Sequence, residues 1–278
     1  MLVNLNQVLK NAQKGGYAVG LFNTTDTDML EGVITAAEQN NSPVIIGTAE
    51  ILLPYGELSL IFPSVIERAK KASVPVVVHY DHGLTFDRCI EAIKLGASSV
   101  MFDGSALSYE ENVRQTAEMV KIAHAFGVSV EGEIGHVGQA STNDGSVEDM
   151  YTTVEDAVDF VRKTNVDALA VAIGTAHGVY KQKPLLDLKG LQSIRDAVDV
   201  PLVLHGGSGL SDDDFKNAIK HGIAKVNIFT DICVAGVKAM SFACENNLDY
   251  LTARNTKVEY IRNETQKKMQ LFGSVNRA

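Results

Sequence analysis

The chain has 278 residues, a net charge of −9 and 45% hydrophobic residues. This acidity argues against nucleic acid or an anionic membrane as a partner, although backbone dipoles can still hold a small anionic substrate. No apolar run reaches the roughly 20 residues that span a bilayer, and the amino terminus lacks a signal-peptide core. The three cysteines form no Cys-x-x-Cys pair, which indicates buried free thiols. We therefore expect a soluble, cytoplasmic protein.

Eight short apolar runs, each followed by a helix-like segment, indicate the fold. They are continuous rather than alternating, as expected for parallel strands that are covered on both faces. Eight strand–helix units predict a (β/α)8 TIM barrel, an α/β fold, as a single domain over residues 1–278 with an extra helix at each end. A doubly wound open sheet is the alternative, but it would more often use five or six strands. The eight runs are 17–23, 43–49, 74–82, 98–103, 128–133, 168–174, 201–206 and 224–230.

Local signals mark where several helices begin and end. Ser108 followed by Glu111 forms a capping box, and Ser211 followed by Asp214 is a weaker version of it. Gly96 stands where a helix should end. The connection over residues 135–152 is long and rich in glycine, serine, asparagine and aspartate, and it is equally compatible with a lid over a site and with a surface insertion.

Three of the apolar runs have a histidine at or just after their carboxyl end, at His82, His177 and His205. A lone histidine is more often a hydrogen-bonded structural residue than a ligand. Three at the carboxyl ends of barrel strands, where TIM barrels place their active sites, predict a metal site. Neutral imidazoles suit Zn²⁺ and leave a coordination position open for substrate. Asp81 beside His82 is interpreted as a general acid or base, and the alternative is that it orients a ligand imidazole.

Glycine-rich turns follow the seventh and eighth predicted strands. Gly206, Gly207 and Ser208 come directly after His205, and residues 226–230 end the eighth strand. Loops at these two places are the usual phosphate cradle of this barrel, using backbone N–H groups and a helix N-terminus. Glycine allows the backbone to approach the anion closely. The sequence therefore predicts a phosphate-bearing substrate.

Taken together, these motifs resemble one family over nearly the whole chain. They resemble the class II, metal-dependent ketose-bisphosphate aldolases of the fructose- and tagatose-bisphosphate type, which are aldehyde-lyases. The motifs that carry the resemblance are Phe22-Asn23, His79-x-Asp81-His82, Met101-Phe102-Asp103-Gly104-Ser105, Glu131-x-Glu133-x-Gly135, residues 170–178, residues 205–209 and Asn227-x-x-Thr230.

The resemblance implies a role for each matching residue. His82, His177 and His205 would hold Zn²⁺, which stabilises the charge that develops when the C3–C4 bond breaks. Asp81 would move the proton of the hydroxyl next to that bond. The resemblance also implies a monovalent cation near the phosphate and a homodimer or homotetramer. Asp103 and Glu133 match positions of a second or displaced metal, and the substrate and its dihydroxyacetone phosphate unit would be held by Asn23, Gly178, Gly206, Gly207, Ser208, Asn227, Ile228, Phe229 and Thr230.

A Schiff-base aldolase would instead need a desolvated lysine inside the barrel. Lys225 is the only candidate on a predicted strand, and it lies early in that strand, away from the tip. This route is therefore disfavoured.

The chain also departs from the family pattern. Ala49 stands where members usually have a serine, and the Asp-Pro-Arg segment whose arginine reaches the distal phosphate of a neighbouring subunit's substrate is absent, with Arg254, Lys257 and Arg262 as the nearest substitutes. The glutamate that members carry in the long loop is replaced by Gln139-Ala140-Ser141.

These departures suggest an aldolase for a ketose 1-phosphate whose other end is not phosphorylated. The aldehyde half would be longer, or would carry a carboxylate or plain hydroxyls. The alternatives are a fructose or tagatose 1,6-bisphosphate aldolase, a metal-dependent phosphosugar epimerase or isomerase, and a non-catalytic sugar-phosphate sensor.

Overall fold

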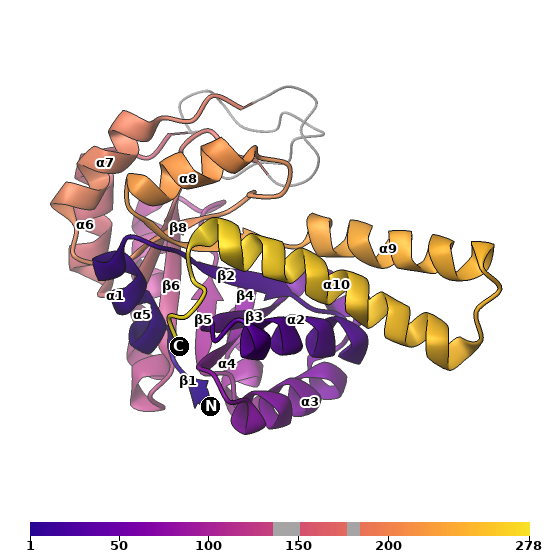
Figure 1. Ribbon diagram of the computed structural model, residues 1–278. Coiled ribbons are helices and arrows are strands. Elements are labelled where there is room, and N and C mark those ends of the chain that lie inside the picture. The colour runs from indigo at the N-terminus through magenta and orange to yellow at the C-terminus, as the bar shows by residue number, and fades with distance from the viewer. Residues whose placement is uncertain (136–150, 177–183) are drawn as a thin grey trace.

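The structure, a computed structural model, describes residues 1–135, 151–176 and 184–278. Its centre is a closed barrel of eight parallel strands in the order β4-β3-β2-β9-β8-β7-β6-β5, closed by pairing of β4 with β5 (Figure 1). Each strand overlaps one of the expected runs, so the predicted TIM barrel is confirmed. The barrel strands are β2 (Val19–Asn23), β3 (Val44–Ala49), β4 (Val76–Gly83), β5 (Ser99–Phe102), β6 (Ser129–Ile134), β7 (Ala168–Val171), β8 (Leu202–Leu204) and β9 (Ile223–Ile228).

Helices cover the outside of the barrel, and a two-residue strand, β1 (Leu2–Val3), pairs with the start of β4. At α5 only half of the predicted capping box forms: the Ser108 hydroxyl accepts a hydrogen bond from the Glu111 N–H at 3.3 Å, but the Glu111 carboxylate bonds to Arg114 and Gln115 instead. The complete capping box forms at α8, between Ser211 and Asp214. The helices are α1 (Leu5–Gly15), α2 (Thr27–Gln39), the 3₁₀ helix η1 (Glu50–Tyr55), α3 (Leu58–Lys71), α4 (Phe86–Leu95), α5 (Tyr109–Ala125), α6 (Val154–Thr164), α7 (Leu188–Ala197), α8 (Asp212–Lys220), α9 (Thr230–Glu245) and α10 (Tyr250–Phe272).

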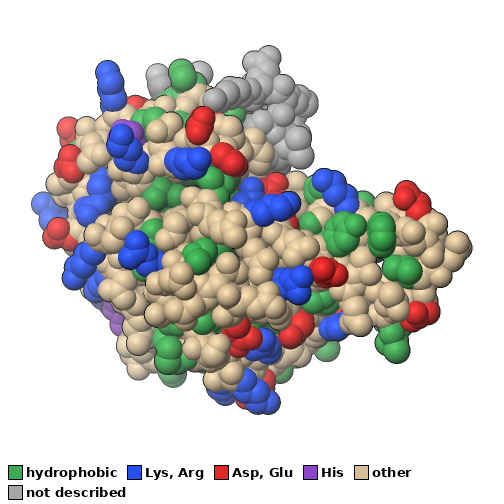
Figure 2. All heavy atoms as spheres, in the orientation of Figure 1, with side chains coloured by type: hydrophobic (Ala, Val, Ile, Leu, Met, Phe, Trp, Pro, Cys, Tyr) green, Lys and Arg blue, Asp and Glu red, His purple; other side chains and the backbone are tan. Residues whose placement is uncertain are grey.

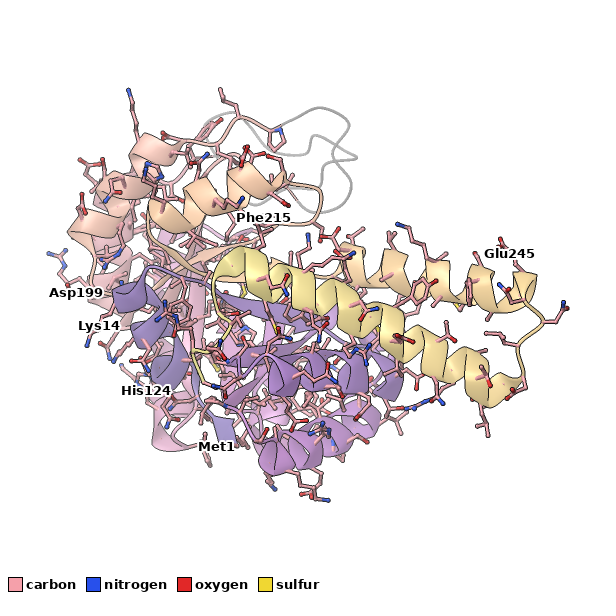
Figure 3. All side chains as sticks on the ribbon, viewed as in Figure 1. Met1, Lys14, His124, Asp199, Phe215 and Glu245 are labelled. Carbon is pink, nitrogen blue, oxygen red and sulfur yellow. The ribbon has the colours of Figure 1, made fainter. Side chains whose placement is uncertain are left out.

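The core has two parts, one outside the barrel wall and one inside its lower half. The outer part lies between the strands and the surrounding helices. In the inner part, the apolar stripe of α1, which includes Leu5 and Leu9, packs on inward-facing strand residues such as Val19 and Val77. Helix α1 thereby closes the amino-terminal end of the barrel. In Figure 3, Lys14 at the end of α1 lies beside Asp199, whose carbonyl oxygen accepts a hydrogen bond from Gln13 at 3.3 Å.

Helices α9 and α10 form an arm that projects away from the barrel, with Glu245 near its far end (Figures 1 and 3). The base of α10 packs against α2 as well as α9. The two helices approach closely at Gly32, where a Cβ atom would lie 2.9 Å from the Ile261 side chain. Any larger residue at Gly32 would therefore push α10 outward.

The cysteines are free thiols with different exposures. Cys89 is buried as expected, Cys233 is half-buried, and the expectation is wrong for Cys244, which is exposed. Cys244 lies near the end of the projecting arm, where few neighbours can cover it. No helix in the described parts of the chain is long and apolar enough to cross a membrane.

Shortening Leu9 tests the role of α1 as the closure of the barrel. Leu9 is fully buried, so Leu9→Ala should lower the free energy of unfolding by about 2–5 kcal/mol. The neighbouring exposed Lys10→Ala is the matched control and should change it by less than about 0.5 kcal/mol. Urea denaturation followed by circular dichroism measures both values. Equal stability of the two variants would show that α1 is not part of the cooperative core.

Candidate active site

A cavity of about 430 Å³ opens at the carboxyl ends of the barrel strands. This is the end opposite α1, and polar side chains replace the apolar filling found below. Most of the predicted site residues that the structure describes line it. The predicted site residues that line the cavity are Asn23, Asp81, His82, Asp103, Glu133, Gly206, Gly207, Ser208, Asn227, Ile228, Phe229 and Thr230.

The two neighbours Asp81 and His82 both reach this site, although successive strand residues normally face opposite sides of a sheet. The strand is irregular at this point: the register between β4 and β5 shifts between Tyr80 and Gly83. His82 also has a positive φ of 46°, which is uncommon for a residue other than glycine. This local strain turns His82 toward the cavity, while Asp81 keeps the inward direction of the regular strand.

His82 and His205 face each other across the cavity floor. The Nε2 atom of His82 lies 2.7 Å from the Nδ1 atom of His205. Behind them, Nδ1 of His82 donates to Asp103 Oδ2 at 2.7 Å, and Nε2 of His205 donates to Glu131 Oε1 at 2.9 Å. Each imidazole therefore has one ring nitrogen held by a carboxylate and the other directed at its partner, which is how proteins orient metal-binding histidines.

This arrangement separates the protonation of the two rings. Burial would lower the pKa of His82, but attraction by Asp81 and the hydrogen bond to Asp103 outweigh it and raise the pKa to about 10. Burial and repulsion by His82 lower the pKa of His205. A cationic His82 can donate from both nitrogens and a neutral His205 can accept at Nδ1, so one hydrogen-bonded chain satisfies all four ring nitrogens.

Asp81 is fixed by two amide side chains. Asn23 donates to Oδ2 at 2.8 Å from the tip of β2, and Asn227 donates to Oδ1 at 3.1 Å from β9. Burial alone would raise the pKa of Asp81, but the attraction of His82 and of Lys225 outweighs it, so the pKa lies well below its usual range. The carboxylate is therefore ionised and precisely oriented at the cavity floor.

The donor groups at the cavity floor suit a divalent metal. Ligand atoms of Asp81, His82 and His205 lie within 4.8 Å of one another, and so do those of His82, Asp103 and Glu133. The two sets share His82 and combine imidazole nitrogens with carboxylate oxygens, a donor mixture typical of Zn²⁺ and similar ions. Asp103 also accepts hydrogen bonds from the amide and hydroxyl of Ser105, so its carboxylate is fixed from two sides.

The two glycine-rich loops lie next to this donor set. Gly206 has a φ of 66°, and a Cβ atom there would collide with the carbonyl oxygen of Ala176, so only glycine fits. The Ser208 hydroxyl accepts a hydrogen bond from the Phe229 N–H at 3.5 Å and ties the loops together. Helix α9 starts at Thr230 without a side-chain cap, and Phe229 and Thr230 line the cavity, which is favourable for an anion.

Some residues considered in the sequence analysis do not line the cavity or lie outside the described residues. His177 and Gly178 lie outside the described residues, as does most of the long connection over residues 135–152 that was considered as a lid. Lys225 is on the inner face of β9 but bonds to both carboxylate oxygens of Glu131, at 2.7 and 3.0 Å. Sequence reasoning missed this pairing. Its only signal was spacing, because Glu131 and Lys225 each stand two residues before a predicted site residue.

The wall of the cavity away from the glycine loops is apolar. It is made by Ala49 at the tip of β3, by Ile51 and Leu52 in η1, and by Leu84 after β4. The three suggested substitutes for a distal arginine are held in ion pairs: Arg254 with Asp28 at 2.8 Å, Lys257 with Asp26 at 2.7 Å and Arg262 with Glu259 at 3.4 Å. Among the described residues that line the cavity, none is lysine or arginine.

Comparison with known proteins assigns the family. A family model described as class-II fructose-bisphosphate aldolase matches residues 3–277. The chain belongs to this family. It is therefore an aldolase, a lyase of a metal-dependent class whose substrates are sugar phosphates. This agrees with the family resemblance of its sequence motifs.

Three relatives show how closely this aldolase follows the family. The crystal structure of the YdjI aldolase from Escherichia coli K12 superimposes with a TM-score of 0.91 and 38% identity over 100% of both chains. The fructose-bisphosphate aldolase of Staphylococcus epidermidis is 36% identical over 100% of this chain and 99% of its own length. The sulfofructosephosphate aldolase of Alkalicoccus urumqiensis is 38% identical over 98% of this chain and 96% of its own.

The hydrogen bond between His82 and His205 predicts that a proton is released when a divalent metal binds. In the metal-free aldolase at pH 7.5, His82 is protonated because its pKa is raised to about 10. A metal that takes the facing nitrogens must displace that proton, so about one proton should be released per ion. Calorimetric titration with Zn²⁺ in two buffers of different ionisation enthalpy measures the number. Zinc binding without proton release at this pH would contradict the assigned protonation of His82.

Proposed function

We propose that this aldolase uses Zn²⁺ to cleave a ketose 1-phosphate reversibly into dihydroxyacetone phosphate and an aldehyde, and that the far end of the substrate carries no phosphate. The observation that carries the proposal is the pair of facing nitrogens of His82 and His205, with the ionised Asp81 beside them and the glycine loops in the same cavity. A metal site, a base and an anion cradle are the three parts that this chemistry requires.

His82 and His205 would hold Zn²⁺ through the two facing nitrogens, with His177 as the third ligand. Asp103 and Glu133, which share a possible metal grouping with His82, would form a second or displaced metal position. The bound ion would act as a Lewis acid on the substrate ketone and hydroxyl oxygens. Asp103 and Glu131 hold the two rings in the orientation that directs these nitrogens toward each other.

Asp81 would be the base in the cleavage direction. It accepts the proton of the C4 hydroxyl as the C4–O bond becomes a carbonyl and the C3–C4 bond breaks, leaving the electron pair on the three-carbon fragment. Asn23 and Asn227 keep Asp81 in place, and the side-chain oxygen of each has no hydrogen-bond partner in the described parts of the chain. These two amide oxygens are suited to accept hydrogen bonds from substrate hydroxyl groups.

The phosphate would be bound by the loops after β8 and β9. Gly206, Gly207 and Ser208 would supply backbone and hydroxyl donors, together with Gly178. Ile228 at the end of β9 and the uncapped start of α9 at Phe229 and Thr230 would add N–H groups and the positive end of the helix dipole. A monovalent cation at this position would offset the negative charge of the phosphate and of the nearby carboxylates.

The apolar far wall supports a substrate without a second phosphate. A phosphate placed against Ala49, Ile51 and Leu52 would find no lysine or arginine among the described lining residues to offset its charge. A longer chain with plain hydroxyl groups fits this wall better than one with a carboxylate. The name of the Alkalicoccus urumqiensis relative describes a sulfonated fructose phosphate, so substrates named for a single phosphate occur among similar proteins.

A homodimer or homotetramer is the proposed assembly. Its support is the apolar surface of the projecting arm, where green side chains gather in Figure 2. Val237 and Met240 on α9 and Leu251 on α10 are all more than half exposed. Contiguous apolar surface of this kind is typical of protein interfaces.

A cytoplasmic location is also proposed, on the ground already given by the sequence, namely the free cysteines.

A cleavage assay tests the proposed reaction. Release of dihydroxyacetone phosphate from fructose 1-phosphate, tagatose 1-phosphate and their 1,6-bisphosphates should require Zn²⁺ and stop with a chelator. The 1-phosphates should have the higher kcat/KM. Asp81→Asn should lower kcat by about 10²–10⁴-fold because the base is lost. Much faster cleavage of a 1,6-bisphosphate would reject the unphosphorylated far end, and interconversion of sugars without cleavage would indicate an epimerase.

A positive charge introduced on the apolar wall tests whether the far end of the substrate lies there. Ile51 is 72% exposed at the cavity rim, so a longer polar residue can replace it with little effect on folding. Ile51→Arg should raise the kcat/KM for fructose 1,6-bisphosphate relative to fructose 1-phosphate by about two- to fivefold, because an exposed ion pair contributes up to about 1 kcal/mol. Ile51→Gln is the uncharged control and should leave the ratio unchanged. The same ratio in both variants would place the distal end elsewhere.

A further inference from the structure

A buried ion pair lies one layer below the histidines, in the middle of the barrel. Glu131 on β6 and Lys225 on β9 face inward and are completely buried. The Lys225 ammonium bonds to both carboxylate oxygens of Glu131, at 2.7 and 3.0 Å. Inward-facing apolar residues such as Ala168 and Val203 fill the layer beneath. Apolar side chains often replace buried ion pairs without loss of stability, so stability alone is a weak reason for this pair.

The pair is connected directly to one of the facing imidazoles. Glu131 Oε1 accepts a hydrogen bond from Nε2 of His205 at 2.9 Å. This bond places the His205 proton on Nε2 and leaves the Nδ1 lone pair directed at His82. Lys225 holds the carboxylate in the orientation that this bond needs. Lys225 itself does not line the cavity and cannot reach a substrate carbonyl without breaking the ion pair.

We propose that Glu131 and Lys225 are positioning residues, which set the tautomer and ring orientation of His205 so that its Nδ1 atom binds a divalent metal. Carboxylates behind metal-binding histidines are a general device for this purpose, and their loss typically lowers metal affinity 10–100-fold. In this barrel, the carboxylate is buried and requires its own cation, which Lys225 provides through the barrel interior from β9, three strands away from β6 in the wall. The inference rests on the proposed metal-dependent function.

The test uses Zn²⁺ binding by the whole chain, measured by competition with a chromogenic chelator. Glu131→Gln should weaken Zn²⁺ binding about 10–100-fold, because an amide can hold the His205 ring only in part. Lys225→Met should weaken binding and also lower the melting temperature, because it leaves the Glu131 charge buried without a partner. The control Arg68→Met breaks the ion pair with Glu38 far from the cavity and should affect stability without changing Zn²⁺ affinity.

The double variant Glu131→Gln/Lys225→Met separates positioning from a merely structural role. It removes both charges, so its melting temperature should recover toward that of the wild type while Zn²⁺ affinity stays low. Recovery of affinity together with stability would overturn the inference. If Lys225→Met fails to fold, Glu131→Gln with the charge-keeping Lys225→Arg supplies the comparison, and Lys225→Arg should bind Zn²⁺ within a few-fold of the wild type.

The tautomer of His205 can be observed directly in the metal-free protein. Two-dimensional ¹H–¹⁵N spectra of the histidine rings should show His205 protonated at Nε2 in the wild type and a mixed population in Glu131→Gln. An unchanged tautomer together with unchanged Zn²⁺ affinity in Glu131→Gln would overturn this inference but not the proposed metal-dependent function. Failure of the wild type to bind Zn²⁺ at all would instead overturn the proposed metal-dependent function on which it rests.

Discussion

The site depends on the need of each buried charge at the carboxyl end of the barrel for a specific partner. Burying an ionised group without a partner costs several kcal/mol, so the interior of this barrel can hold several charges only as a connected set. Here Lys225 pairs with Glu131, Glu131 with His205, His205 with His82, and His82 with Asp103. Each hydrogen bond in this series runs from one donor to one acceptor. The imidazole rings therefore cannot turn without leaving a buried group unsatisfied. This series of hydrogen bonds therefore fixes the facing nitrogens of His82 and His205 before any metal or substrate arrives.

The same barrel separates stability from chemistry along its axis. Below the ion pair, α1 and small apolar strand residues fill the interior and form an ordinary packed core. Above it, the strand ends carry polar side chains, and the cavity opens between them. Loops can vary at the upper end without affecting the packing below. The apolar wall of Ala49, Ile51, Leu52 and Leu84 lies at this upper end.

Much of the fold and part of the site could be predicted from the sequence. The eight strands follow from continuous apolar runs, and His82, Asp81 and His205 are brought together because parallel strands end at the same rim. The turned backbone at His82 could not be predicted, because nothing in a His-Tyr-Asp-His run specifies a positive φ. The partnership of Glu131 with Lys225 was also missed, since it joins strands 94 positions apart along the chain through a contact inside the barrel. The role of His177 remains a prediction.

The most direct test of the account is the position of the metal itself. Anomalous diffraction at the zinc absorption edge, from crystals grown with Zn²⁺, locates the ion without reference to activity. We expect a peak at the cavity floor that is coordinated by Nε2 of His82 and Nδ1 of His205, with His177 as the third ligand. A well-occupied peak bound by other residues, or no peak between His82 and His205 when Zn²⁺ is in excess, would contradict the proposed metal site.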